Sequence, residues 1–307
     1  MKAVFIDANP TLATVAERLH QSGDLPLTIN NQPDITSDRI PQVLGDAEIL
    51  IVDHTSLPTN IARQCKALRH VVFLGTGARS YMDVEALGEL GIEVHIIKGY
   101  GDTAVAECAF GLMWTAAKGF ARMDRGMRAG QWLRTEGVQL TGKTLGLVGY
   151  GGIGAEMARL ARGVGMNVLA WNRSPRQVDG VRFVELEELL GQSHVVSLHL
   201  LLTDETRGFL SADRLAQMRD GAILINTARG ALVDEAAMIA ALKSGRLAHA
   251  GLDVFDIEPM PANHALTQID NVTLSAHSAF RTPEATDNLI GAALNHCRRI
   301  SGQGSQA

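Results

Sequence analysis

Three polar residues in the second half of the chain each follow an apolar run that predicts a β-strand. They are Arg229 in INTARGALVDE, Glu258 in LDVFDIEPMP and His277 in NVTLSAHSAF. Because ligands of open α/β sheets lie beyond the carboxyl ends of the strands, such residues can converge although they are far apart in sequence. Arginine can bind a carboxylate and polarise a carbonyl, and a histidine can donate a proton to a developing alkoxide. With Glu258 orienting His277 and favouring its charged form, this set suits the reduction of a 2-oxo acid.

Each of the three residues also has a structural interpretation. Arg229 can cap a helix or form an ion pair, Glu258 can be a solvated loop acid, and His277 is one of ten histidines. Paired polar groups are often structural. Their order along the chain, after a cofactor motif, favours the catalytic interpretation.

A glycine-rich loop joins a predicted strand to a predicted helix. The apolar run at 145–148 ends in GYGGIG, and AEMARLARGVG follows with helical spacing. In such a loop the first glycine permits a tight turn, the second admits a pyrophosphate, and the third lets the helix pack on the strand. The helix N-terminus adds amide donors. Glycines also collect in ordinary turns, but this context predicts a dinucleotide site that consists of Gly149, Gly151, Gly152, Ile153 and Gly154.

The residues after the next predicted strand bear on cofactor choice. NAD-binding enzymes usually carry an acid there that binds the ribose 2′-hydroxyl, whereas this chain has Asn172, Arg173, Ser174 and Arg176. A carboxylate is missing and two guanidinium groups stand where a 2′-phosphate would lie, so NADP(H) is expected to be preferred, with NAD(H) possible. Alternatively, both arginines are solvated loop charges, or Arg173 stacks on adenine with either cofactor.

Six segments in a fixed order carry a resemblance to a known family. They are FLGTGARSYMDVEAL, AVAECAFGLM, LVGYGGIG, SLHLLLTDETRGFL, INTARGALVDE and LDVFDIEPMP. With them the chain resembles, over almost its whole length, the D-isomer-specific 2-hydroxyacid dehydrogenases, which include phosphoglycerate dehydrogenase and glyoxylate/hydroxypyruvate reductase. The resemblance implies NAD(P)H-dependent reduction of a glyoxylate-, hydroxypyruvate- or phenylpyruvate-type 2-oxo acid to the D-2-hydroxy acid.

The resemblance also implies roles for particular residues. Arg229, Glu258 and His277 correspond to the family's catalytic residues, and Asp253 to an acid near the nicotinamide carboxamide. Thr227 is included among the cofactor-binding candidates. The substrate carboxylate is expected to meet the backbone amides of the loop Gly75, Thr76, Gly77 and Ala78, in addition to Arg229.

This chain departs from the family pattern at a few positions. The loop after Ala78 is one residue longer than is usual, so Arg79, Ser80 and Tyr81 are expected to alter the substrate pocket. Gly101 stands where asparagine is common, and Leu201 where proline is common.

Two series of alternating strands and helices must position these residues. Apolar runs KAVFID, EILIVD, HVVFLG and IEVHII form the first series, and TLGLVG, NVLAWN, VRFV, HVVSLHL, GAILIN, HAGLDV and NVTLSA form the second. This rhythm predicts an α/β fold with doubly wound parallel sheets, the second sheet having six or seven strands. A long helix is expected at 103–127, another at 283–300, and a frayed tail after it.

The expected domains follow from these series and from the resemblance. Residues 99–280 are expected to form a Rossmann NAD(P)-binding domain. Residues 1–98 and 281–307 are expected to form a discontinuous, flavodoxin-like substrate domain, with the active-site cleft between the two. The resemblance further implies a homodimer packed through the long helix.

Composition excludes several other classes of function. The chain has 307 residues, of which 46% are hydrophobic and 20% charged, and no apolar run approaches the roughly 20 residues that a bilayer requires. The N-terminus lacks a secretory signal, so a cytoplasmic location is expected. Three distant cysteines provide neither a disulfide framework nor metal-ligand spacing, and no metal is expected. A net charge of −5 without a basic stripe argues against nucleic acid and for a small-molecule ligand.

Two other functions are compatible with this fold. An NAD(P)-sensing corepressor would bind the cofactor without turnover, and the intact triad favours the enzyme over it. A formate dehydrogenase of the same superfamily would be expected to have glutamine at the position of Glu258.

Overall fold

The computed structural model describes residues 1–174 and 176–302, and the chain divides into two compact units. Unit 1 consists of residues 1–101 together with those from Thr282 on, and unit 2 consists of Asp102–Arg281. The expected frayed tail lies mostly outside the described residues.

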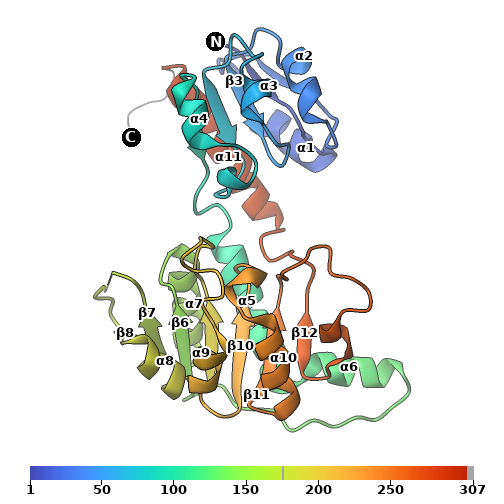
Figure 1. The fold of residues 1–307 in the computed structure, drawn as a ribbon, viewed down its shortest axis with the longest axis vertical. Coiled ribbons are helices and arrows are strands. Elements are labelled where there is room, and N and C mark those ends of the chain that lie inside the picture. Colours follow the sequence, from blue (N-terminus) through green and yellow to red (C-terminus); the bar gives the residue numbers. More distant parts are fainter. Residues whose placement is uncertain (175, 303–307) are drawn as a thin grey trace. The chain divides into compact units, whose positions relative to one another are not determined.

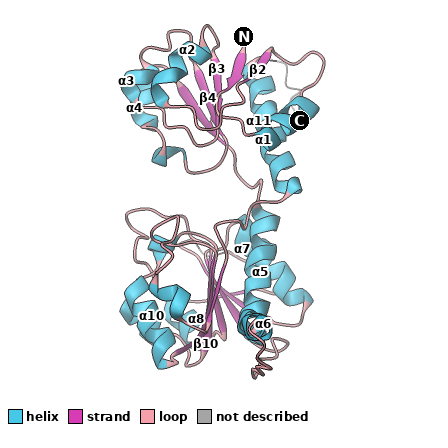
Figure 2. Ribbon diagram, turned by 90° about the vertical axis from the view of Figure 1, so that its right-hand side faces the viewer, coloured by secondary structure: helices cyan, strands magenta, loops and turns pink. Residues whose placement is uncertain are grey.

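Unit 1 is a five-stranded parallel sheet with helices on both faces (Figures 1 and 2). The sheet order is β2-β1-β3-β4-β5. Helices α1 and α11 cover one face, and α2, α3 and α4 cover the other. The elements are β1 (Ala3–Phe5), α1 (Pro10–Leu19), β2 (Leu27–Ile29), η1 (Ser37–Arg39), α2 (Ile40–Leu44), β3 (Ile49–Val52), α3 (Thr59–Ala62), β4 (His70–Phe73), η2 (Ala78–Ser80), α4 (Val84–Glu89), β5 (Glu93–Ile96) and α11 (Pro283–Ile300).

Unit 2 contains a seven-stranded parallel sheet of order β12-β11-β10-β9-β6-β7-β8. Helices α5 and α7 pack on one face, and α8, α9 and α10 on the other (Figure 2). The elements are α5 (Asp102–Lys118), α6 (Phe120–Arg128), β6 (Thr144–Val148), α7 (Gly152–Gly163), β7 (Asn167–Trp171), β8 (Arg182–Phe183), α8 (Leu186–Gln192), β9 (Val195–Leu198), α9 (Ala212–Gln217), β10 (Ala222–Asn226), η3 (Gly230–Leu232), α10 (Glu235–Ser244), β11 (Leu247–Leu252), η4 (Ala265–Gln268) and β12 (Val272–Leu274).

Both sheets have the order of doubly wound folds, which confirms the predicted α/β class. The central strands are short runs buried along their whole length, such as ILIV in β3 and AILIN in β10. Such runs are typical of parallel strands that helices cover on both faces. In unit 2 the strand order reverses between β6 and β9, and in unit 1 between β1 and β3. Ligands of such sheets bind where the order reverses, outside the carboxyl ends of the strands.

The single long helix expected at 103–127 is wrong in one respect, because the structure has two helices there. Gly119 separates α5 from α6 and adopts a left-handed conformation, with φ at +67°. A Cβ atom at Gly119 would lie 2.8 Å from the hydroxyl oxygen of Thr135, so a larger residue is excluded by the returning segment as well as by the backbone angle. Apolar spacing continues across this break, which is why the sequence pattern did not reveal it.

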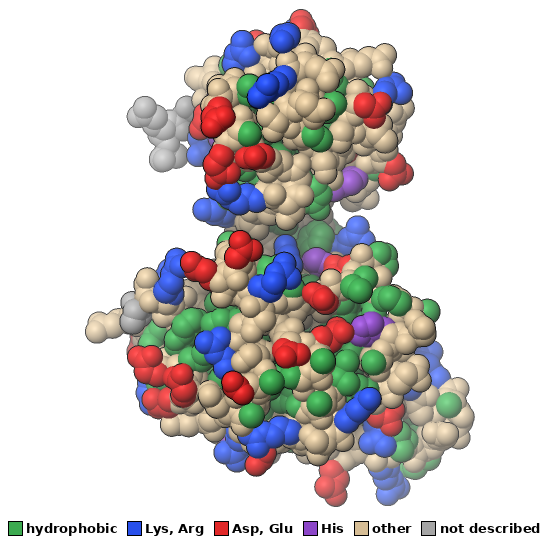
Figure 3. All heavy atoms as spheres, viewed as in Figure 1, with side chains coloured by type: hydrophobic (Ala, Val, Ile, Leu, Met, Phe, Trp, Pro, Cys, Tyr) green, Lys and Arg blue, Asp and Glu red, His purple; other side chains and the backbone are tan. Residues whose placement is uncertain are grey.

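No described helix combines the length and the apolar composition that crossing a bilayer would need. On the face that Figure 3 shows, acidic and basic side chains are intermixed.

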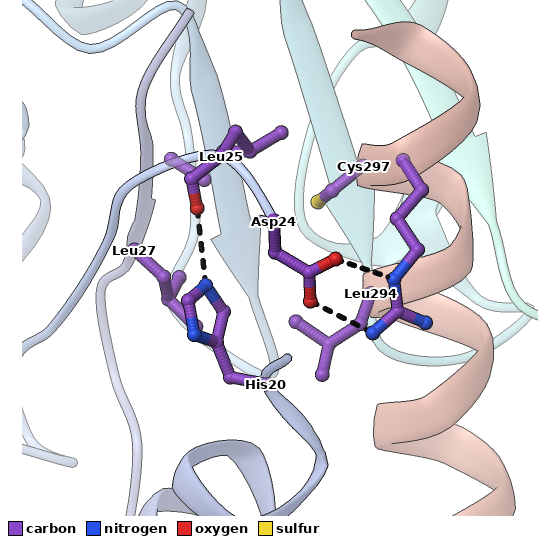
Figure 4. Close-up of a pocket in the computed structure, with 8 residues that line it drawn as sticks. His20, Asp24, Leu25, Leu27, Leu294 and Cys297 are labelled. Carbon is purple, nitrogen blue, oxygen red and sulfur yellow. Dashed lines mark hydrogen bonds and ion pairs between the residues drawn. The ribbon is translucent and has the colours of Figure 1, made fainter. Parts of the chain in front are cut away.

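Helix α11 returns to unit 1 and is fastened there by a largely buried ion pair. Nε and Nη2 of Arg298 donate to the two carboxylate oxygens of Asp24, at 2.7 and 2.8 Å (Figure 4). The side chains are only 19% and 11% exposed. Hydrogen bonding by Arg298 lowers the pKa of Asp24 to about 2. The pair lies beside a small pocket, lined also by His20 and Leu294, that contains none of the predicted site residues.

Replacing Arg298 is expected to leave the Asp24 carboxylate buried without its partner. Arg298→Met should lower the free energy of unfolding by roughly 1.5–3 kcal/mol at pH 7. Because the folded-state pKa of Asp24 is depressed, its contribution is present above the unfolded value near 3.8 and lost as the pH falls towards 2. Urea titrations should therefore show the difference between wild type and variant shrinking over that interval. Arg18→Met, which removes a more exposed pair with Asp287, should cost at most about 1 kcal/mol. A difference that persists unchanged at pH 2 would contradict this account.

Candidate active site

The glycine loop between β6 and α7 has the geometry of a phosphate-binding turn. Gly149 has φ at +99°, and a Cβ atom there would lie 2.5 Å from the carbonyl oxygen of His199. A Cβ atom at Gly154 would lie 2.5 Å from the carbonyl oxygen of Gly149. The first glycine thus permits the turn and the third permits the close approach of α7, as predicted for a G-x-G-x-x-G loop.

The middle of the loop differs from its two ends. Gly151 is the N-cap of α7, and a Cβ atom there would meet nothing within 4 Å. Gly152, by contrast, faces the carboxylate of Asp102, which a Cβ atom would overlap. Ile153 packs its side chain against the core shared by α5 and α7. Open space therefore lies at Gly151, where backbone amides of a helix N-terminus can receive a phosphate.

The loop after β7 contacts the glycine loop through Asn172. Its Oδ1 accepts a hydrogen bond from the amide of Tyr150 at 3.4 Å, and its Nδ2 donates to the carbonyl of Ser174 at 3.0 Å. Arg173 is 90% exposed and 3.9 Å from the exposed Glu205. Arg176 is also exposed, and its charge counters the rise that burial causes in the pKa of Tyr150. The exposed guanidinium groups of Arg173 and Arg176 thus lie beside the glycine loop, and neither has a buried partner among the described residues.

A buried hydroxyl at the end of β10 lacks a hydrogen-bond partner. Thr227 is 7% exposed, and its Oγ1 has no partner among the described residues. An orphaned buried hydroxyl costs free energy, which a polar ligand atom would recover. Asn226, one residue earlier, fixes the loop by accepting from the amide of Ala228 and donating to the carbonyl of Arg229.

Arg229 presents its guanidinium outward from this loop. Its Nη1 donates to the carbonyl of Ala228 at 2.7 Å, and no carboxylate in the described chain pairs with it. The next residue, Gly230, touches the backbone of Phe255, because a Cβ atom there would lie 2.0 Å from the carbonyl carbon of Phe255. The loops that carry Arg229 and Glu258 are thereby in direct backbone contact. Arg229 can bind an anionic ligand group.

Glu258 and His277 form a hydrogen-bonded pair. Nδ1 of His277 lies 2.6 Å from Oε2 of Glu258, whose Oε1 accepts from the amide of Phe255 at 2.8 Å. The side chain of His277 is 37% exposed and that of Glu258 is 33% exposed, so both are accessible to a ligand. Since Nδ1 is engaged, Nε2 is the ring nitrogen left to exchange a proton with a substrate.

A buried carboxylate supports the loop that carries His277. Asp253 has no exposed surface and accepts hydrogen bonds from the Ser275 hydroxyl and from the amides of Ser278 and Ala279, at 2.6, 3.0 and 2.9 Å. Its carbonyl accepts from the amide of His277 at 2.7 Å. His277 itself has φ at +47°, the one non-glycine residue with positive φ among those described. Asp253 therefore positions His277, a role that the sequence did not reveal, while its contact with a cofactor stays a prediction.

The predicted substrate loop belongs to unit 1 and follows β4. Gly75 has φ at +150°, and Ala78 is buried where η2 begins. Within the described residues, the amides of Thr76, Gly77 and Ala78 have no acceptor. Three free donors in sequence can bind a carboxylate. Of the residues expected to alter the substrate pocket, Arg79 pairs with Glu85, and Tyr81 packs on Phe73 with ring centroids 5.2 Å apart.

Unit 1 has its own buried aspartate, which sequence reasoning missed. Asp7 is fully buried after β1 and accepts from the amides of Asp53, His54 and Thr55 at 2.8 to 2.9 Å. The hydroxyl of Thr55 is buried without a partner in the described chain. An acid immediately after an apolar strand was the available signal, in KAVFID as in AGLDV.

Comparison with known proteins gives consistent matches. Residues 110–279 match the profile of the D-isomer specific 2-hydroxyacid dehydrogenase, NAD binding domain. A hydroxypyruvate reductase of Thermotoga maritima is 35% identical over 257 residues, 82% of this chain and 84% of that protein. A glyoxylate reductase of Aeropyrum pernix is 38% identical over 252 residues, 75% of each. Among solved structures, a glyoxylate reductase from Paecilomyes thermophila has a TM-score of 0.86 at 32% identity, covering 98% of this chain and 95% of that one.

A methyl group at Gly154 should push α7 away from the turn at Gly149, because it would collide with the carbonyl oxygen of Gly149. Gly154→Ala is expected to lower the free energy of unfolding by about 1–3 kcal/mol, because the opposing atom is backbone and cannot rotate away. It should also weaken dinucleotide binding in a fluorescence titration. Gly163→Ala is the matched control on the same helix, since a Cβ atom there meets nothing within 4 Å. That variant should keep the affinity and be as stable as wild type or slightly more stable. Unchanged binding by Gly154→Ala would contradict the assignment.

Proposed function

The chain belongs to the D-isomer specific 2-hydroxyacid dehydrogenase family, and from this premise we propose that it reduces a small 2-oxo acid to the D-2-hydroxy acid with a reduced nicotinamide cofactor. The observation that carries the proposal is the Glu258–His277 pair, with Nε2 free, in a group of loops that also presents an unpaired Arg229. Glyoxylate, hydroxypyruvate and phenylpyruvate are the substrate types proposed, the first two also being named in relatives.

Each unit has a separate role in this proposal. Unit 2 binds the cofactor, in agreement with the matched NAD-binding profile, and corresponds to the domain expected at 99–280. Unit 1 is the substrate domain, expected at 1–98 and 281–307. Its loop at 75–78 has free amides, which are donors of the kind that a carboxylate needs.

The residues of unit 2 fit a dinucleotide. The space beside Gly151 admits a pyrophosphate at the N-terminus of α7, and the orphaned hydroxyl of Thr227 needs a polar partner. When bound, the reduced nicotinamide supplies a hydride to the substrate carbonyl carbon.

The side chains of the triad carry out the remaining chemistry. Arg229 binds the carboxylate of the 2-oxo acid and polarises its carbonyl, which orients the reacting carbon. His277 donates a proton from Nε2 to the oxygen that becomes the alkoxide. Glu258 accepts the hydrogen bond from Nδ1, fixes the ring, and stabilises the charged imidazole before the proton leaves. Asp253 keeps His277 in its left-handed conformation throughout.

NADP(H) is the proposed preferred cofactor, and NAD(H) is accepted as well. Asn172 is neutral, so it lacks the carboxylate that would repel a 2′-phosphate. Arg173 and Arg176 are exposed beside the same loop and are available for charge-assisted hydrogen bonds to a phosphate.

The proposal includes a homodimer and a cytoplasmic location. Four large apolar side chains are exposed on α6 and the segment after it, namely Phe120, Met127, Trp132 and Val138. Exposed apolar groups that gather in one segment are typical of an interface. Cys65, Cys108 and Cys297 are free thiols in this structure, which is compatible with a reducing compartment.

Removal of the proton donor tests the proposed reaction. His277→Ala should lower kcat for 2-oxo acid reduction by ~10²–10⁴ while NADPH binding, followed by fluorescence, is retained. His264→Ala is the control, since His264 also pairs with a glutamate, Glu235, but outside the site. Its kcat should stay within about twofold of wild type. A His277→Ala enzyme of wild-type rate would remove His277 from the mechanism. Wild-type protein that binds NADPH and turns over none of the three acids would instead support the corepressor alternative.

Arg173 tests the choice of cofactor. A charge-assisted hydrogen bond is worth roughly 1.5–3 kcal/mol, and the exposure of Arg173 places the effect at the lower end. Arg173→Ala should therefore raise KM for NADPH about tenfold and leave KM for NADH nearly unchanged. Asn172→Asp should shift kcat/KM further towards NADH. An equal effect of Arg173→Ala on both cofactors would show that it stacks on adenine or does not contact the cofactor.

A further inference from the structure

Two histidines and a glutamate gather at the edge of the unit 1 sheet, at the amino ends of β4 and β5, whereas the loop at 75–78 follows the carboxyl end of β4. Nδ1 of His70 lies 3.2 Å from Nε2 of His95, and Oε2 of Glu93 lies 3.6 Å from the first nitrogen and 3.8 Å from the second. The three ligand atoms thus form a compact triangle. None of them is used by the proposed reaction.

The sheet register brings these side chains together. His70 is the first residue of β4 and is paired with Glu93, the first residue of the edge strand β5. His95 follows Glu93 by two residues, so both point to the same face of the sheet. The two imidazoles are 23% and 15% exposed, whereas Glu93 is 68% exposed. Two ligands are consequently held by packing, and the third can adjust at the surface.

The triangle matches the ligand spacing of zinc. With Zn–N and Zn–O distances near 2.0–2.1 Å and tetrahedral angles, ligand atoms are about 3.3–3.5 Å apart. The three separations here lie within a few tenths of an ångström of that range, with the largest deviations at Glu93, the most exposed ligand. Two imidazoles and one carboxylate are a donor set that suits Zn²⁺.

The charges around the triangle are mixed. Burial lowers the pKa of His95, and so do His70 and Arg299, while Glu93 opposes this shift. His296 of α11 packs its ring 5.6 Å from that of His95, and its own pKa is lowered by burial. A neutral imidazole is the form that binds a metal. Arg299 would repel a bound cation, and the charge of Glu93 offsets it.

We propose that His70, Glu93 and His95 bind one Zn²⁺ ion, with water at the fourth position. The ion would clamp the edge strand β5 to β4 at the amino ends of both strands. Without metal, the two imidazoles share a hydrogen bond, and on binding the ring that donates moves this proton to its other nitrogen. The site departs from the expectation of no metal, which relied on cysteine spacing. The i, i+2 spacing of Glu93 and His95 on a strand was the one sequence signal.

The proposal is tested by metal binding to the full-length, chelator-treated protein. Isothermal titration with ZnCl₂, checked by elemental analysis, should give about one Zn²⁺ per chain. His70→Gln and Glu93→Gln should each weaken the affinity by at least about tenfold, because even supporting residues of metal sites have effects of that size. His20→Gln, also in unit 1, should bind like wild type. Zn²⁺ should raise the Tm of wild type and not that of His70→Gln.

Two further measurements distinguish zinc binding at this site from loss of the fold and from zinc binding at the active-site pair. Glu93→Gln alters an exposed edge residue and should have wild-type circular dichroism, so a loss of binding there is not a loss of fold. The Glu258–His277 pair is the alternative zinc site. His277→Ala removes it, and this variant should retain the zinc affinity of wild type. The proposal is overturned if His70→Gln and Glu93→Gln both bind as tightly as wild type, or if binding disappears only in His277→Ala.

Discussion

The buried carboxylate of Asp253 is the constraint on which the geometry of the site depends. A carboxylate without exposed surface is costly unless donors surround it, and here a hydroxyl and two amides of the segment 275–279 do so. To provide those donors the segment must fold tightly around Asp253, and His277 takes the left-handed conformation that results. The ring then reaches Glu258, which is itself held by the amide of Phe255. Strain at one residue is thus balanced by hydrogen bonds to a neighbouring strand end.

A similar arrangement occurs in the other sheet, where the carboxylate of Asp7 accepts hydrogen bonds from three consecutive amides of the segment after β3. Both aspartates follow buried strands at the carboxyl edge, and both order a loop that belongs to the adjacent strand. A doubly wound sheet presents its loops at this edge, and short loops there have few contacts of their own. A buried acid therefore gives a loop a fixed shape without a bound ligand.

Much of this architecture could be predicted from the sequence, because buried parallel strands and a glycine turn have strong local patterns. The seven strands of unit 2, helix α11 and the glycine loop were identified in this way. Strand β2 was not, since it has three residues and is only half buried at the edge. The break at Gly119 depends on contact with Thr135, and the roles of Asp253 and Asp7 depend on which amides fold around them. The triangle at His70 requires knowledge of strand register. The break, the roles of the two aspartates and the triangle all depend on tertiary contacts, which residue types and spacing do not determine by themselves.

The return of α11 to unit 1 has a consequence for biosynthesis. Unit 2 is one continuous segment, so its sheet can assemble as soon as residues up to 281 have left the ribosome. Unit 1 cannot, because Leu289, Ile290 and Leu294 complete the core face that β1, β3 and α1 provide. Until they emerge, the apolar face of the first hundred residues stays uncovered, and the contact between Asp24 and Arg298 must close across a separation of 274 residues. Unit 1 is therefore completed after unit 2, although most of its residues precede unit 2 in the chain, and in that interval it is the part a chaperone would be expected to hold.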